Sequence, residues 1–269
     1  MLSKIVANRV VPSTLKTSLL YPNDRPRAAS LIFSHIPKYT KNIHSIFLTG
    51  ASIELLLCHK NINVKAYTHN KELVTFWACV VWDKLKVAKI AREFRELLRD
   101  EEVFYSVQER RNESSDPFVR AGLFFALNRS VQGGLVSCGK HDPGLPRFSD
   151  RVLHDLATSN FNNLVVNPTE NYTDKIDVED DTFLICCPYE KYSSRLHSMA
   201  PPPLEKRKID HTAIRNKLIN RNNWLLLYEY SDDVLDAYAG FDYELYTRFF
   251  KQTDDDDKAD YVLIFSNNL

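Results

Sequence analysis

A strand, a short turn of small residues, a helix and a second strand follow one another early in the chain. The apolar strand "HSIFL" (44–48) breaks at Thr49-Gly50-Ala51-Ser52 and leads into the helical run "IELLLCHK", and "NVKAY" (63–67) is the next predicted strand. This order is that of a βαβ unit, which builds a parallel sheet. Because the chain holds only seven glycines, a glycine directly after a strand is informative.

The same alternation resumes in the last third of the chain. Strands are predicted at 163–167, 182–186 and 224–230, with a helix at 211–222. The run "WLLLYEY" is apolar enough for a strand buried on both faces. After it, "YELYTRFFK" and "DYVLIFSN" predict an antiparallel pair joined by the acidic turn "QTDDDDKA". The predicted fold class is therefore α/β, with a mostly parallel sheet that ends in an antiparallel hairpin.

The middle of the chain has a different pattern. Residues 82–102 carry apolar side chains at helical spacing and a basic opposite face, which is more often a solvated face than a DNA contact. Further on, Asp116 is a predicted N-cap with Pro117 at the first helical position. A glycine-rich loop and another helix follow. We predict that 79–160 form a helical insertion between the two parts of an α/β domain, 1–78 and 161–269.

Composition limits the classes of partner and the compartment. Lys+Arg and Asp+Glu number 35 each, so the chain has no overall attraction to nucleic acid or acidic membranes. No apolar run approaches the roughly 20 residues of a membrane span, and the first residues lack the apolar core of a secretion signal. The five cysteines show no paired metal spacing. We therefore expect an intracellular, cytoplasmic protein with free thiols, no metal and no membrane.

Five short segments, in this order, resemble the DNA adenine methyltransferases of the Dam-like class, and the likeness covers nearly the whole chain. They are "RPRAASLIFSHIPK" (25–38), "IFLTGAS" (46–52), "YTHNKELVTFW" (67–77), "FFALNRSVQGGL" (124–135) and "CCPY" (186–189). The resemblance implies a Rossmann-like methyltransferase sheet, with 79–160 as a target-recognition subdomain.

The resemblance also implies a site for S-adenosylmethionine, held by a glycine-rich turn and by acidic groups after two strands. The matching positions are Arg25, Ile46, Gly50, Ser52 and Thr68. Ile46 stands where the class has Glu, Ser52 where it has a second glycine, and Thr68 where it has an acid. Each lost hydrogen bond to a charged group costs about 1.5–3 kcal/mol. We therefore expect S-adenosylmethionine to bind weakly or not at all.

The catalytic motif of the class, D-P-P-Y, corresponds to Cys186, Cys187, Pro188 and Tyr189. In the class, the aspartate and the next carbonyl accept hydrogen bonds from the adenine amino group, and the tyrosine stacks on the flipped base. A thiol is a weak acceptor, so Cys186 cannot replace the aspartate. We expect the shape of a base pocket without its polar group.

If the chain binds DNA, the contacts are expected in the insertion. The "LNR" segment and the loop after it supply Asn128, Arg129, Lys140, Arg147 and Arg151, and glycines there let the backbone approach phosphate closely. The alternative is that Arg129 caps or ion-pairs the helix that it ends.

Three functions remain open from the sequence. The first is a degenerate methyltransferase homologue that binds DNA or protein, as the inactive partner of an active methyltransferase subunit for example. The second is an active S-adenosylmethionine-dependent DNA adenine methyltransferase with altered motifs. The third is a structural interaction protein that touches no nucleic acid. The joint loss at Ile46, Thr68 and Cys186 weighs against an enzyme.

Overall fold

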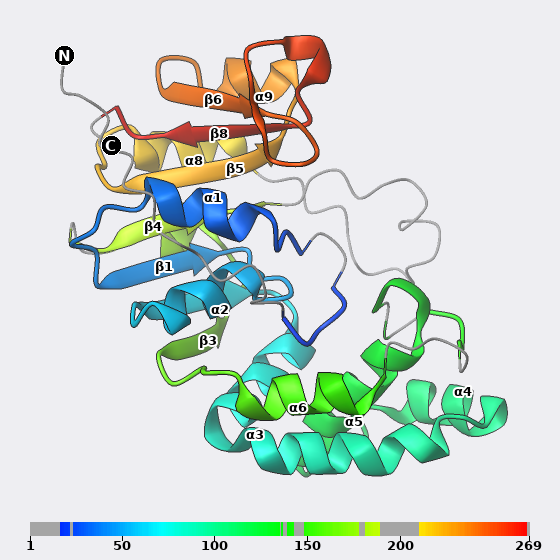
Figure 1. The fold of residues 1–269 in the computed structure, drawn as a ribbon. Coiled ribbons are helices and arrows are strands. Elements are labelled where there is room, and N and C mark those ends of the chain that lie inside the picture. Colours follow the sequence, from blue (N-terminus) through cyan, green and yellow to red (C-terminus); the bar gives the residue numbers. More distant parts are fainter. Residues whose placement is uncertain are drawn as a thin grey trace.

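The computed structural model describes residues 17–21, 24–134, 136, 139–142, 148–177, 181–188 and 210–267. These residues form one mixed sheet with the strand order β3-β2-β1-β4-β5-β8-β6-β7 (Figure 1). Its strands are β1 (Asn42–Ile46), β2 (Asn63–Thr68), β3 (Leu164–Pro168), β4 (Phe183–Cys186), β5 (Trp224–Glu229), β6 (Asp242–Tyr246), β7 (Gln252–Thr253) and β8 (Tyr261–Phe265).

The strand directions confirm the predicted α/β class. β3, β2, β1, β4 and β5 run parallel, whereas β8 lies antiparallel between β5 and β6. The prediction that one acidic turn joins β6 to β8 is wrong. Gln252 and Thr253 pair with β6, and a 3-10 turn follows at Asp256–Lys258. Asp255 caps that turn by accepting a hydrogen bond from the Asp257 amide at 3.1 Å, so part of the acidic run is ordered by its own side chains.

Helices cover both faces of the sheet. One apolar layer joins the sheet to α1 (Ala28–His35), α2 (Ser52–His59) and α3 (Lys71–Leu97), and the other joins it to α8 (His211–Leu218) and α9 (Asp232–Ala237) (Figure 1). The central strand β5 supplies both layers: Leu225 and Leu227 face the first, and Trp224, Leu226 and Tyr228 face the second. Its continuous apolar run is therefore a strand buried on both faces, as predicted.

The middle of the chain is helical in the part that the structure describes. The second half of α3 is followed by α4 (Glu101–Arg110), α5 (Pro117–Ser130) and α6 (Asp150–Thr158), and no strand of the sheet comes from the described residues between 79 and 160. Asp116 accepts a hydrogen bond from the Phe118 amide at 2.8 Å, with Pro117 in the first turn, which confirms the predicted start of α5.

Both predicted ends of the helix 82–102 are wrong. The expected helix 82–102 is the second half of α3, which runs on from Lys71 through non-helical φ/ψ angles at Asp83. α3 then ends at Leu97, because Asp100 caps a new helix by accepting a hydrogen bond from the Val103 amide at 3.0 Å. The boundary at 79 falls inside α3, and one apolar cluster spans the sheet and the insertion. None of the described helices is long and apolar enough to cross a membrane.

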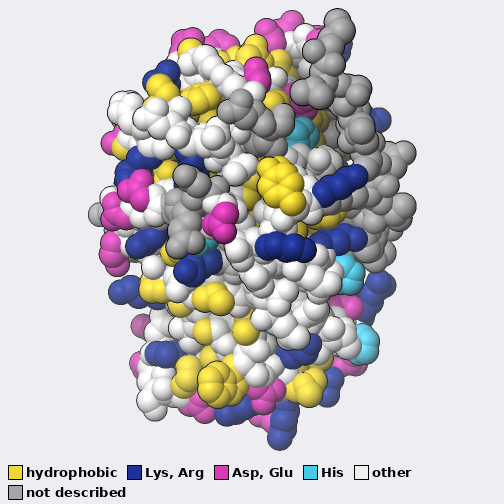
Figure 2. All heavy atoms as spheres, turned by 90° about the vertical axis from the view of Figure 1, so that its left-hand side faces the viewer, with side chains coloured by type: hydrophobic (Ala, Val, Ile, Leu, Met, Phe, Trp, Pro, Cys, Tyr) yellow, Lys and Arg dark blue, Asp and Glu magenta, His cyan; other side chains and the backbone are white. Residues whose placement is uncertain are grey.

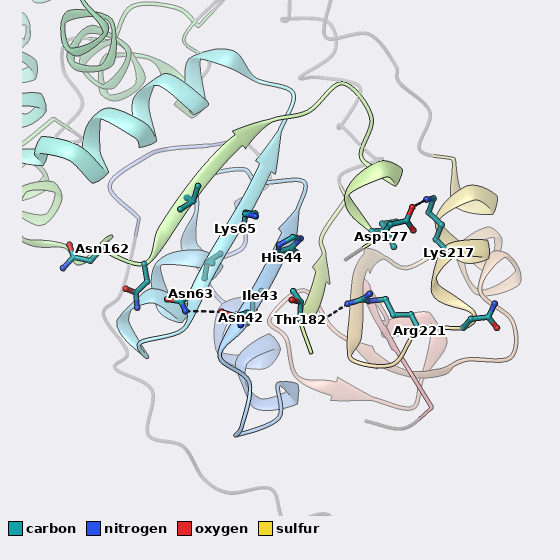
Figure 3. Close-up of a pocket in the computed structure, with 15 residues that line it drawn as sticks. Asn42, Ile43, His44, Asn63, Lys65, Asn162, Asp177, Thr182, Lys217 and Arg221 are labelled. Carbon is teal, nitrogen blue, oxygen red and sulfur yellow. Dashed lines mark hydrogen bonds and ion pairs between the residues drawn. The ribbon is translucent and has the colours of Figure 1, made fainter. Parts of the chain in front are cut away.

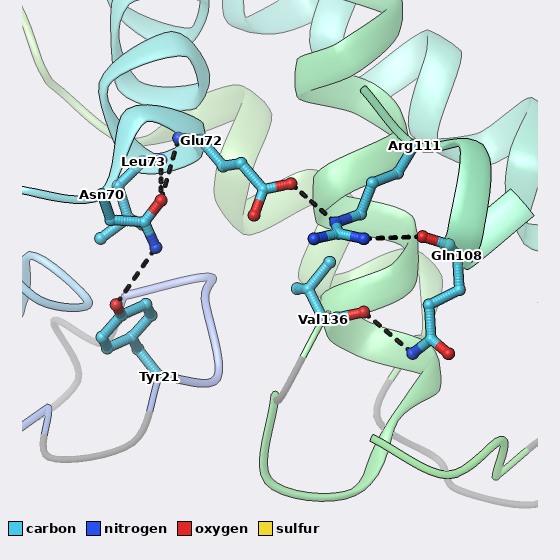
Figure 4. Close-up of polar contacts among 7 residues, drawn as sticks. All are labelled: Tyr21, Asn70, Glu72, Leu73, Gln108, Arg111 and Val136. Carbon is cyan, nitrogen blue, oxygen red and sulfur yellow. Dashed lines mark hydrogen bonds and ion pairs between the residues drawn. The ribbon is translucent and has the colours of Figure 1, made fainter. Parts of the chain in front are cut away.

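Polar contacts join the start of α3 to the end of α4 and to the N-terminal segment (Figure 4). Asn70 caps α3 and donates from its amide to the Tyr21 hydroxyl at 3.4 Å. The first turn of α3 carries Glu72, whose carboxylate lies 2.9 Å from the Arg111 guanidinium. Gln108, one turn earlier in α4, donates to the Val136 carbonyl at 2.9 Å. The N-terminal segment and the end of α4 thus both contact the start of α3.

Candidate functional site

The candidate site lies where the chain order of the strands reverses, between β1 and β4. In open α/β sheets, ligands bind outside the carboxyl ends of the strands at such a point. Ile46 and Cys186, the last residues of the two strands, are direct neighbours in the sheet. The Cys187 amide donates to the Ile46 carbonyl at 3.4 Å. The structure therefore brings the positions matched to the cofactor turn and to the catalytic motif to one edge of the sheet.

The glycine turn holds a carboxylate from the chain itself. Ser52 is the first residue of α2, and its amide donates to Asp24 Oδ1 at 3.2 Å while its hydroxyl donates to Oδ2. A Cβ on Gly50 would lie 2.7 Å from Asp24 Cγ, closer than real contacts allow. The free N–H groups and the dipole of a helix N-terminus make it an anion site. Gly50 and Ser52 thus form that site around Asp24.

A second carboxylate, Glu54, lies two residues further along the first turn of α2 and is also buried. Burial raises its pKa to about 7, against a hydrogen bond from Ser45 that lowers it, and nearby Asp24 raises it further. Burial likewise raises the pKa of Asp24 to about 6, although the hydrogen bonds from Ser52 lower it. Both carboxyl groups therefore change protonation near neutral pH, which sequence reasoning did not detect.

Arg25 joins β5 to the segment that follows β4. Its guanidinium donates to the Leu227 carbonyl at 3.0 Å and to the Pro188 carbonyl at 3.4 Å, and it lies 5.2 Å from the centre of the Tyr261 ring. Only 8% of Arg25 is exposed. The basic residue of the first matched segment therefore reaches the predicted catalytic loop, where it is bound by the protein's own backbone.

The cysteines at the positions of the catalytic motif are weak nucleophiles in this structure. Cys186 is fully buried in an apolar cluster, and burial raises the pKa of its thiol well above the ordinary value. Cys187 is half-buried, and burial raises its pKa to about 12. Because the thiolate is the reactive form of cysteine, neither side chain is a nucleophile at neutral pH. Pro188 is buried, and Tyr189 lies outside the described residues.

Thr68, at the position where the methyltransferase class has an acid for the cofactor ribose, also contacts the protein itself. Thr68 is 1% exposed, and its hydroxyl accepts a hydrogen bond from the Asn70 amide at 3.2 Å. Beside it, the rings of Phe47 and Tyr172 lie 3.9 Å apart between centres, and the Tyr172 hydroxyl accepts a hydrogen bond from the His69 amide at 3.1 Å. Aromatic side chains thus cover the carboxyl ends of β1 and β2, and no sequence motif indicated them.

The residues expected to contact DNA are split between the interior and the surface. Asn128 is fully buried: its amide nitrogen donates to the carbonyls of Leu20 (2.6 Å) and Gly134 (3.1 Å), and its oxygen accepts from the Leu20 amide at 2.8 Å. Arg129 is 8% exposed. Lys140 and Arg151 are exposed. Arg147 lies outside the described residues. The predicted set is therefore not one surface, and Asn128 binds the N-terminal segment.

The chain was compared with models of protein families and with curated proteins. No model of a protein family matches the chain, and no curated protein matches its sequence.

Proposed function

We propose that this chain is a degenerate DNA adenine methyltransferase homologue, a pseudo-methyltransferase, that acts as a DNA-binding or protein-binding module. In that role it would be the inactive partner of an active subunit. The observation that carries the proposal is the Asp24 carboxylate at the N-terminus of α2, in the turn that the resemblance assigns to S-adenosylmethionine.

The occupied turn argues against a bound cofactor. S-adenosylmethionine carries a carboxylate on its amino-acid part, and an anion at this helix end would have to displace Asp24 or accept a like charge beside it. The hydroxyl of Thr68 already accepts a hydrogen bond from the Asn70 amide. The arrangement of the sheet, mostly parallel with antiparallel strands at its C-terminal end, agrees with the fold that the resemblance implies.

Methyl transfer is the direct test. We expect purified protein, incubated with labelled S-adenosylmethionine and DNA of mixed sequence, to leave no label on adenine. We also expect no thermal shift with sub-millimolar cofactor, because a ligand that binds the folded state must stabilise it. An active adenine methyltransferase, assayed in parallel, is the positive control. Labelled adenine above background would support the alternative of an active enzyme with altered motifs.

DNA binding tests which partner the module takes. On the face drawn in Figure 2, the described Lys and Arg side chains are mixed with Asp and Glu, so a DNA contact there would be local. Binding should therefore be modest and fall with salt, by about 0.9 log units per log unit of salt for each phosphate contact. We expect the double variant Lys140→Ala/Arg151→Ala to weaken binding of every sequence in gel shifts.

The matched control for the DNA experiment removes two exposed cations from the connection between β6 and β7, in the variant Arg248→Ala/Lys251→Ala. Gel shifts at two salt concentrations should show weaker binding only for the insertion variant. Equal affinity of both variants, with circular dichroism unchanged, would remove this surface as the DNA contact and favour a protein partner.

A further inference from the structure

A pocket of about 540 Å³ lies at the amino ends of β1 and β2. The two strands begin side by side, where the Asn63 side chain donates to Asn42 Oδ1 at 3.1 Å (Figure 3). Lys41 and Ile62, the residues directly before the two strands, line the pocket. Phe33 of α1 lines it as well, and with Ile62 it belongs to the apolar layer that joins the sheet to α1 and α2. The pocket therefore lies on the face that these two helices cover.

Three lysines line the pocket, and no carboxylate does. Lys38 and Lys41 are exposed, and Lys60 is half-buried. The Lys60 ammonium lies 5.8 Å from the centre of the Phe33 ring, beside the apolar wall of the pocket. No ion pair or hydrogen bond joins any of the three ammonium groups to a described residue. All their donors are therefore available to a ligand.

Carboxylates are scarce around these lysines. Residues 25–67 are described throughout and contain a single acid, Glu54, in the first turn of α2, whereas Lys60 follows the last turn. Asp181 precedes β4 as Lys41 precedes β1, in neighbouring strands, but it does not line the pocket and pairs with none of the three lysines. The two acids before Asp181 lie outside the described residues. The pocket itself is thus lined by positive charge alone.

The helix ends beside the pocket do not explain three lysines. α1 and α2 both end there, and a helix C-terminus carries about half a negative charge, so two ends offset about one lysine. The last carbonyls of α2 are already bonded to the backbone: the Lys60 amide donates to the Leu57 carbonyl at 3.0 Å, and the Asn61 amide donates to the Cys58 carbonyl at 2.9 Å. The lysine side chains are therefore not needed as caps.

Thr40 supplies an unpaired hydroxyl to the same pocket. The residue is only 7% exposed, and its amide donates to the Pro37 carbonyl at 3.1 Å in the turn before β1. Its hydroxyl forms no hydrogen bond within the part of the chain that the structure describes. A buried hydroxyl without a partner is costly unless a molecule in the pocket completes its hydrogen bond. Thr40 is therefore a second, independent indication of a ligand.

We propose that this pocket binds the phosphate group of a phosphate monoester. Such a group carries a charge of about −1.5 to −2 at pH 7 and three acceptor oxygens, which matches three ammonium groups and a hydroxyl donor. Lysine binds phosphate as a point charge. Asn61, which lines the pocket with a φ of +59°, offers an amide for the organic part of the ester. Small-molecule sites have volumes of about 300–1,000 Å³, a range that includes this pocket.

The pocket is separate from the candidate site. Asp24 contacts Ser52, the first residue of α2, whereas Lys60 follows His59, the last residue of that helix. Binding at the two ends of α2 is therefore independent, and this proposal and the proposed function can fail separately.

Calorimetric titration of the full chain tests the assignment with glucose 6-phosphate, inorganic phosphate and glucose. We expect glucose 6-phosphate to bind most tightly, inorganic phosphate more weakly, and glucose not at all, because the phosphate carries the charge. Lys60→Ala should weaken the binding of glucose 6-phosphate roughly tenfold, since one charge-assisted hydrogen bond is lost. Lys89→Ala, at an exposed lysine of α3, is the matched control and should bind as the parent does.

Vesicle flotation distinguishes a lipid source of the phosphate from a soluble one. Phosphatidic acid carries a phosphate monoester as its head group, and phosphatidylserine of the same mole fraction is the control for charge alone. Binding to phosphatidic acid vesicles without binding of glucose 6-phosphate, and its loss in Lys60→Ala, would assign the monoester to a lipid. Equal binding to both kinds of vesicle would overturn the assignment to a monoester.

Thr40→Val separates binding from folding, because it removes the hydroxyl and keeps the shape of the side chain. We expect roughly threefold weaker binding of the ester and a midpoint of urea unfolding no lower than that of the parent, since no hydrogen bond within the described chain is lost. Lower stability with unchanged binding would assign the hydroxyl to the fold and overturn the proposal. So would the absence of binding to both monoesters at millimolar concentration, or equal affinity of Lys60→Ala and Lys89→Ala.

Discussion

Replacing Asn128 with alanine is expected to lower the free energy of unfolding by about 2–4 kcal/mol, because three backbone groups lose their hydrogen-bond partner. Those groups are the amide and the carbonyl of Leu20 and the carbonyl of Gly134. The site cannot relax easily: Gly134 has a φ of +74°, and a Cβ there would lie 1.6 Å from the Leu20 oxygen. Urea unfolding of both proteins, followed by circular dichroism, measures the difference.

The control for this measurement is Asn112→Ala, at an exposed position between α4 and α5. A surface substitution of this kind should stay within about 0.5 kcal/mol of the parent. Limited proteolysis adds a local readout, since loss of Asn128 should expose the segment around Leu20 to cleavage. A change below about 1 kcal/mol for Asn128→Ala would mean that its amide contributes no more than a typical single hydrogen bond, despite its burial.

Asn128 also shows what sequence patterns can reveal about such a site. The segment "LNR" was assigned to the recognition region by its order among the other motifs, and α5 does end there. A pattern of that kind does not say which way a side chain faces. The partner of Asn128 is Leu20, 108 residues away in the sequence, so the contact depends on tertiary structure alone.

The sheet, in contrast, was predictable because its signals lie in short stretches of the sequence. Short apolar runs such as "WLLLYEY" need burial on both faces, and alternation with helices leaves few arrangements other than a mostly parallel sheet. The N-cap at Asp116 was predictable because capping is local. The stop at Asp100 is equally local, and its signal, an aspartate directly before Glu101 and Glu102, was present in the sequence.

The candidate site was predictable only in its position. Ile46 and Cys186 are neighbours at the switch point of the sheet, but Asp24 was not expected beside Gly50. Its indirect signal was Ser52 at a glycine position, because a hydroxyl at the start of a helix can hold a carboxylate. The aromatic cover of Phe47 and Tyr172 has no such signal, since the two residues come from segments far apart in the chain.

Stability should fall as pH rises from about 4 to about 7, an effect that the two buried carboxyl groups produce together. The folded-state pKa of Glu54 is about 7 against an ordinary 4.5, and that of Asp24 is about 6 against 3.8. Raised values mean that the folded chain binds protons that the unfolded chain has lost, so the stabilisation is complete below the ordinary pKa and disappears above the folded one. For Glu54 this amounts to about 3 kcal/mol.

Glu54→Gln tests that assignment directly. The variant keeps an acceptor for the Ser45 hydroxyl and removes the charge, so at pH 8 it should be more stable than the parent by about 1–3 kcal/mol. Its pH dependence should shrink to the part that belongs to Asp24. Cys58 and Cys187 lie near Glu54, but burial raises the pKa of each thiol to about 12, so neither titrates in this range.

Chemical unfolding at a series of pH values, with the exposed Glu109→Gln as the matched control, gives both slopes. The control should follow the parent at every pH. A Glu54→Gln variant with the parent's slope would show that Glu54 does not titrate in this range, and the Glu54 part of the argument would fail. A flattened slope would show that the turn assigned to a cofactor lies beside a carboxyl that is protonated near neutral pH. Such a site keeps the Glu54 carboxyl protonated and holds the Asp24 carboxylate at the start of α2. Because the amide and the hydroxyl of Ser52 both donate to Asp24, neither is left to bind a ligand.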